Sequence, residues 1–125
     1  MSYQQPSRLK FFRFSLVFLV LIISYLAFTP LHQETGIMSG FDKANHLLAF
    51  FVLALFSHFS FIDKPHYKVI IFPLLGYAFF IELVQYFLPF RSFSVFDIVA
   101  DLCGIILYII LHKQLLKTSR WSKLL

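Results

Sequence analysis

Residues 69–88 read VIIFPLLGYAFFIELVQYFL, and this stretch decides the fold class. A bilayer core needs roughly 20 mostly apolar helical residues per crossing, and the run supplies them with Glu82 as its single charged residue. The run is continuous rather than alternating, and it far exceeds the usual strand length of about 5 to 6 residues. Lys68 and Arg91 flank it. The stretch therefore predicts a transmembrane helix.

Three more apolar runs accompany this one, so the sequence predicts an all-α membrane protein with four transmembrane helices. The predicted spans cover about residues 11–31, 44–62, 69–88 and 94–112. The chain is 59% hydrophobic and 14% charged, whereas soluble domains carry about 25% charged residues. Four crossings use about two thirds of the chain. Residues 1–125 are therefore expected to form one membrane domain with short loops.

The first apolar run also has features of a signal peptide, because Arg8, Lys10 and Arg13 precede it. The run is long for a signal peptide, and residues 26–30 offer no small-x-small cleavage site. We therefore expect an uncleaved first helix.

The orientation of the helices follows from the basic residues, which favour the cytoplasmic side in short loops. With four spans, only Lys43 and Arg91 lie on the outer side. The inner side takes Arg8, Lys10, Arg13, Lys64, Lys68, Lys113, Lys117, Arg120 and Lys123. Both termini are therefore predicted to be cytoplasmic, with residues 113–125 as a basic tail. Because the cations flank apolar runs, the net charge of +5 indicates a lipid bilayer as partner rather than nucleic acid.

Ionisable residues inside the apolar runs are the candidates for function, because a charge at the bilayer centre costs about 2.5 to 3.5 kcal/mol. Asp42 and His46 lie at i and i+4 on one face of the second predicted helix. Asp97 and Asp101 repeat that spacing on the fourth. At about 1.5 Å of rise per residue, Glu82 and Asp101 lie at matching depths of about 9 to 10 Å. One leaflet thus gathers a candidate ligand-binding set of Asp42, Lys43, His46, Glu82, Gln85, Arg91, Asp97 and Asp101.

The remaining histidines and the cysteine are assigned no chemistry. His58 lies near the inner end of the second run without such ionisable neighbours, which favours a packing role. His32, His66 and His112 fall at helix ends or in loops. Cys103 is the only cysteine, which excludes an intrachain disulfide, and its apolar neighbours suit a buried thiol.

The polar residues also follow one another in an ordered pattern, which is D-K-x-x-H at 42–46, E-x-x-Q at 82–85, R-S-F-S at 91–94, and D-x-x-x-D at 97–101 followed by Gly104. The pattern resembles the VanZ-like family of small multi-helix bacterial membrane proteins, named after an accessory protein of glycopeptide resistance. This resemblance adds Ser92 to the candidate ligand-binding set. It implies a multi-pass protein of the bacterial cytoplasmic membrane with a role in the cell envelope. Relatives commonly have glycine in place of Phe90 and asparagine in place of Asp101.

The first functional hypothesis is a non-enzymatic accessory or binding protein. In it, Lys43 and Arg91 contact a phosphate or carboxylate of an envelope lipid or a glycopeptide-like ligand. An effect on antibiotic tolerance would follow from such binding. The hypothesis assigns no metal, no cofactor and no catalytic residue, and it leaves a homo-oligomer open.

Three alternatives stay open beside it. The first is a membrane enzyme in which the acids and His46 hold a divalent cation that acts on a lipid-linked phosphate. The second is a proton or ion relay. The third is a structural network that fixes helix register. The network would place three carboxylates beside only two cations and one histidine. This excess of acids would be costly unless the acids are protonated, hydrated or bridged by a bound species, and it therefore counts against a purely structural role.

Overall fold

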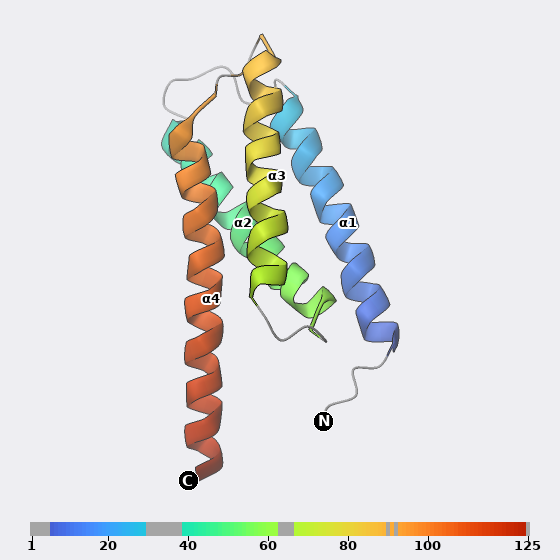
Figure 1. The fold of residues 1–125 in the computed structure, drawn as a ribbon, viewed down its shortest axis with the longest axis vertical. Helices are drawn as coiled ribbons and strands as arrows, with labels where there is room; N and C mark the ends of the chain where they lie inside the picture. The colour runs from blue at the N-terminus through green and yellow to red at the C-terminus, as the bar shows by residue number, and fades with distance from the viewer. Residues whose placement is uncertain (1–5, 30–38, 63–66, 90, 92, 125) are drawn as a thin grey trace.

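The computed structural model describes residues 6–29, 39–62, 67–89, 91 and 93–124, without the side chains of 39–42 and 119–124. Over these residues the fold is all-α, as predicted. The four helices are α1 (Pro6–Phe28), α2 (Ser39–Ser60), α3 (Lys68–Phe87) and α4 (Val95–Leu124). Figure 1 shows α2 passing behind α3 at an angle, between α1 and α4. Helix α2 contacts all three other helices, and its most extensive contact is with α4.

Three of these helices are long and apolar enough to cross a membrane, namely Pro6–Phe28, Lys68–Phe87 and the Val95–Thr118 part of α4. The chain is thus a multi-pass membrane protein by the length and composition of its helices. Within the described residues, α2 is not among the three, because Lys43, Asn45, His46 and His58 lower its hydropathy. The fourth predicted span is therefore not established by composition.

The helix ends differ from the predicted spans at both termini. Helix α1 begins at Pro6, before the first predicted span, and includes the basic residues Arg8, Lys10 and Arg13. Helix α4 continues through most of the predicted tail, to Leu124. The start of α1 and the end of α4 lie at the same end of the bundle (Figure 1).

The core of the bundle is apolar and is centred on α2. Phe50, Leu53 and Ala54 of α2 are buried in one cluster with Ile81 of α3 and Ile105 of α4. Helix α1 has no fully buried residue and packs along the rim of this cluster. Many large apolar side chains point outward, among them Phe14, Phe18, Phe72, Phe79 and Phe96. In a bilayer, these outer faces would be covered by lipid.

Helices α2 and α4 approach each other closely at Gly104. A Cβ atom at this position would collide with the carbonyl oxygen of Leu47 and lie 3.0 Å from the backbone nitrogen of Phe51. The missing side chain lets the two backbones touch, and this contact brings the start of α4 beside the start of α2. Cys103, which precedes Gly104 on α4, was expected to be buried, but its side chain is exposed.

Candidate functional site

Lys43 of α2 reaches across to the first turn of α4. Its Nζ atom forms an ion pair with Oδ1 of Asp97 and donates a hydrogen bond to Oγ of Ser94 at 3.3 Å. The Asp97 side chain is 6% exposed and that of Lys43 is 38% exposed. A carboxylate in the first helical turn is also favoured by the positive end of the helix dipole. The cation and the helix terminus therefore both stabilise a negative charge on Asp97.

His46 lies one helical turn further along α2 and stands between two acids of α4. Its Nδ1 atom is 2.8 Å from Oδ1 of Asp101, which is fully buried. Its Nε2 atom is 3.5 Å from Oδ2 of Asp97. The two aspartates lie at i and i+4 and therefore on one face of α4. The imidazole ring of His46 lies between their carboxyl groups.

Glu82 brings a third carboxylate to the same place from α3. Its side chain is fully buried. The Oε2 atom accepts a hydrogen bond from the backbone N–H of Ser94 at 2.9 Å. The Oε1 atom is buried and has no hydrogen-bond partner among the described residues. One donor atom from each of His46, Glu82 and Asp97 lies within 4.8 Å of the other two.

Gln85 and Arg91 turn toward α1 instead of toward the acids. Gln85 donates through Nε2 to the carbonyl oxygen of Ala27 at 2.9 Å. Arg91 donates through one terminal nitrogen to the carbonyls of Leu26 and Thr29, at 3.1 Å and 2.8 Å. The last carbonyls of a helix lack partners within the helix, so the two side chains cap the end of α1.

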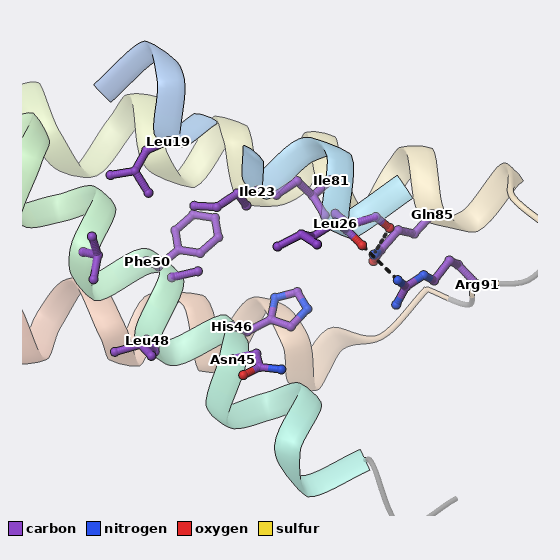
Figure 2. A pocket seen from close by; sticks show the side chains of 13 residues that line it. Leu19, Ile23, Leu26, Asn45, His46, Leu48, Phe50, Ile81, Gln85 and Arg91 are labelled. Carbon is purple, nitrogen blue, oxygen red and sulfur yellow. Dashed lines mark hydrogen bonds between the residues drawn. The ribbon is translucent and has the colours of Figure 1, made fainter. Parts of the chain in front are cut away.

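A cavity of about 390 Å³ lies beside these caps, with walls from α1, α2 and α3. Its walls are mainly aliphatic and aromatic, and the hydrophilic residues of its lining are Asn45, His46, Gln85 and Arg91. Figure 2 shows Gln85 and Arg91 together at one end, His46 and Asn45 nearby, and Leu19 and Phe50 farther along. The lining residues are Leu19, Ile23, Leu26, Ala27, Asn45, His46, Leu48, Ala49, Phe50, Val52, Ile81, Gln85 and Arg91.

The structure therefore divides the predicted set into two neighbouring groups. An acid cluster contains Lys43, His46, Glu82, Asp97 and Asp101. A capping pair, Gln85 and Arg91, holds the end of α1. Within the acid cluster, Asp101 contacts His46. The Asp42 side chain and Ser92 lie outside the described residues, so their predicted roles are not placed.

Sequence reasoning missed Ser94, which binds both Glu82 and Lys43. A signal for it was present, because Ser94-x-x-Asp97 directly before an apolar run has the form of a helix-capping box. Asn45 was missed as well, since a lone amide within an apolar run carries no spacing signal.

A second polar group lies at the opposite end of the α2–α4 contact. His58 Nδ1 is 2.7 Å from the Tyr108 hydroxyl, and His112 Nδ1 is 3.0 Å from the Tyr67 hydroxyl. The His58 and His112 rings meet edge to face, with centroids 4.3 Å apart. His58 was expected to have a packing role without ionisable neighbours, and the structure adds Tyr108 and His112 as polar neighbours. Its partners come from α4 and from the residue that precedes α3, and no spacing along the chain reveals them.

Comparison with known proteins identifies the family of this chain. The family model described as VanZ/LLP1 matches residues 1–117. A protein of fission yeast (Schizosaccharomyces pombe), described as uncharacterized, is 34% identical over 117 residues, which is 86% of this chain and 69% of the yeast protein. No solved structure matches the chain significantly. A relative in yeast means that membership does not by itself imply a bacterial source. By the extent of the family match, the chain belongs to the VanZ/LLP1 family.

Proposed function

We propose that the protein is a non-enzymatic binding protein of a cell membrane, and that its cavity holds a lipid with an anionic headgroup. The observation that carries this proposal is the composition of the cavity. Its walls are apolar over α1, α2 and α3, and Arg91, Gln85, His46 and Asn45 contribute its polar groups. Ligand sites have volumes of about 300 to 1,000 Å³ and combine apolar walls with a few placed polar groups, and this cavity fits that description.

Arg91 is the residue assigned to the anionic headgroup. It lines the cavity, whereas Lys43 does not and is engaged with Asp97. The Nε atom of Arg91 is buried and has no hydrogen-bond partner among the described residues. A guanidinium binds phosphate or carboxylate through its fixed fork of N–H donors. We therefore assign to Arg91 alone the contact that the sequence had assigned to Lys43 and Arg91 together.

The proposed placement in the membrane has four crossings and both termini in the cytoplasm. Two observations support it. The start of α1 and the end of α4 lie at one end of the bundle (Figure 1), which is the end with most of the basic residues. The polar residues Lys43 and His46 of α2 contact the acids of α4, so the helix can cross without presenting them to lipid. The cavity's polar groups then belong to the outer leaflet.

The ligand class is an envelope lipid rather than a glycopeptide, because the cavity is small and mostly apolar. In a bacterium, we expect the protein in the cytoplasmic membrane, and the expected phenotype of its loss is altered tolerance to antibiotics that act on the envelope. The binding function itself does not depend on that phenotype.

Binding of a fluorescent phosphatidic acid by the purified protein in nanodiscs of neutral lipid tests the proposal. Arg91→Gln should weaken binding about 10- to 100-fold, because a hydrogen bond to a charged group contributes about 1.5 to 3 kcal/mol. Lys68→Gln is the matched control, since Lys68 is an exposed cation at the start of α3 and should leave binding unchanged. Equal affinity of the Arg91→Gln variant and the parent protein would contradict the assignment.

A second variant tests the cavity while leaving Arg91, and with it the cap on α1, in place. Ala49 lines the cavity, so Ala49→Phe fills space without removing any polar group and should reduce binding of the lipid chain. Gly76→Phe adds a ring at an exposed position, where a Cβ atom has no other atom within 4 Å, and it is expected to bind as the parent does. Circular dichroism of each variant reports whether the helices are retained.

A further inference from the structure

We propose that His46, Glu82 and Asp97 form a binding site for a divalent transition-metal cation such as Zn²⁺ or Mn²⁺. The three residues come from α2, α3 and α4, and one donor atom of each lies within 4.8 Å of the other two. Two ligand atoms that share a metal at about 2.0 to 2.2 Å lie at most about 4.4 Å apart. Small rotations of the side chains therefore suffice to close the set around one ion.

The Oε1 atom of Glu82 is the observation that points to a ligand. The Glu82 side chain is fully buried, and its Oε2 atom is already bound by the Ser94 N–H. Oε1 is buried without a hydrogen-bond partner among the described residues. A buried polar atom without a partner is costly, and a cation held with His46 and Asp97 would satisfy it.

The setting of His46 is that of a metal-ligating histidine. Nδ1 lies 2.8 Å from Oδ1 of Asp101, so an N–H at Nδ1 donates to that carboxylate and the lone pair falls on Nε2. Nε2 faces Oδ2 of Asp97 at 3.5 Å. Histidines that bind metals nearly always donate their other ring N–H to a carboxylate, a carbonyl or water. Asp101 would thus orient the ligand without touching the metal.

The charges of the cluster agree with a divalent ion. Glu82, Asp97 and Asp101 are all buried. Lys43 pairs with Asp97, so with all three carboxyl groups ionised and His46 neutral, the three acids and the lysine carry two excess negative charges. Buried charges are usually paired or coordinate a metal. A protonated His46 without any metal is the competing arrangement, and the experiments below separate the two.

The ligand types also limit which metal ions the site can favour. One imidazole and two carboxylates suit Zn²⁺ or Mn²⁺, whereas Ca²⁺ and Mg²⁺ are bound by oxygen ligands. Three protein ligands leave at least one coordination position open. Because His46 also lines the cavity, the ion would stand beside the cavity's polar residues. The site stands on its own and does not require that the cavity binds lipid.

Metal binding is measured on the full chain in detergent after removal of any affinity tag and stripping with EDTA. Zn²⁺ is titrated against a chromophoric chelator, and bound metal is counted by elemental analysis after gel filtration. We expect about one Zn²⁺ per chain. Glu82→Gln and His46→Gln should each lower the affinity by at least about tenfold, and Asp101→Asn by about 10- to 100-fold through the orientation of His46. His112→Gln, a histidine of the opposite polar group, should bind as the parent does.

A measurement on the unmodified chain covers the case in which a variant does not fold. Zn²⁺ that binds the folded state raises the midpoint of thermal unfolding, and EDTA reverses the shift. No shift with Zn²⁺ or Mn²⁺, or equal affinity of the parent and the Glu82→Gln variant, would overturn the proposal in favour of a protonated His46. The phosphatidic acid assay distinguishes this result from a failure of the proposed function, because Glu82→Gln should lose the metal and still bind the lipid.

Discussion

His46 Nδ1 lies 2.8 Å from Oδ1 of the fully buried Asp101, and this contact joins α2 to α4 across the polar end of the bundle. The sequence places the two residues 55 positions apart. Their contact orients the imidazole toward Asp97, so it determines what the acid cluster can bind.

Removal of the Asp101 carboxyl group should destabilise the bundle. Asp101→Ala leaves the His46 N–H without its acceptor and should lower the free energy of unfolding by about 1 to 3 kcal/mol. Asp101→Asn keeps an acceptor oxygen and should cost less. Thermal unfolding in detergent, followed by circular dichroism, compares the two variants. Equal midpoints for the alanine variant and the parent would show that the contact does not support the fold.

Gly104 should not tolerate even one added methyl group. In Gly104→Ala, the new Cβ meets the Leu47 carbonyl oxygen and the Phe51 nitrogen. Both atoms belong to the backbone and cannot move aside cheaply. Overpacking of this kind costs about 1 to 3 kcal/mol. Gly76→Ala is the matched control, because no atom lies within 4 Å of its Cβ and alanine is the better helix former by about 0.8 to 1 kcal/mol. Opposite shifts in the unfolding midpoint are expected for the two variants.

The ion pair of Lys43 and Asp97 should show a measurable coupling energy. Lys43→Met leaves the buried carboxylate of Asp97 without its cation, and Asp97→Asn removes the charge that attracts the lysine. Because Lys43 is 38% exposed, solvent screens the pair and the coupling should be about 1 kcal/mol rather than that of a fully buried pair. A double-mutant cycle on unfolding free energies gives this value directly. Additive effects of the two substitutions would mean that the pair adds no stability.

The hydrogen bond between Tyr108 and His58 should stabilise the opposite end of the α2–α4 contact. Tyr108→Phe removes the hydroxyl that lies 2.7 Å from His58 Nδ1 and should cost about 0.5 to 1.5 kcal/mol. Tyr86→Phe is the control, since Tyr86 is 64% exposed and should change stability little. A similar loss in both variants would indicate that the His58 contact contributes nothing specific.

The proposed topology can be checked with single cysteines, after Cys103→Ser removes the native thiol. Val95→Cys, at the start of α4, should react with a membrane-impermeant maleimide in intact cells. Thr118→Cys, near the other end of α4, should react only after permeabilisation, because the basic residues around it favour the cytoplasmic side. Both positions are exposed in the fold. The reverse pattern would place the polar end of the bundle in the cytoplasm.

The sequence by itself determined the helical class and the membrane environment. Continuous apolar runs such as 69–88 can satisfy their backbone in lipid only as helices or in a closed barrel, and they are too long for ordinary strands. The i and i+4 spacing of Asp97 and Asp101 also determined that these acids share a face of α4. Periodicity along one helix is a local property, so these features needed no knowledge of the other helices.

Only the tertiary structure decided which polar groups meet. The crossing of α2 and α4 at Gly104 sets the rotation of each helix, and this rotation pairs Lys43 with Asp97 and His46 with Asp101. The position of α1 turns Arg91 toward backbone carbonyls and away from the acids. Several cations and acids of similar depth could pair in more than one way, and the choice rests on contacts between helices far apart in the chain.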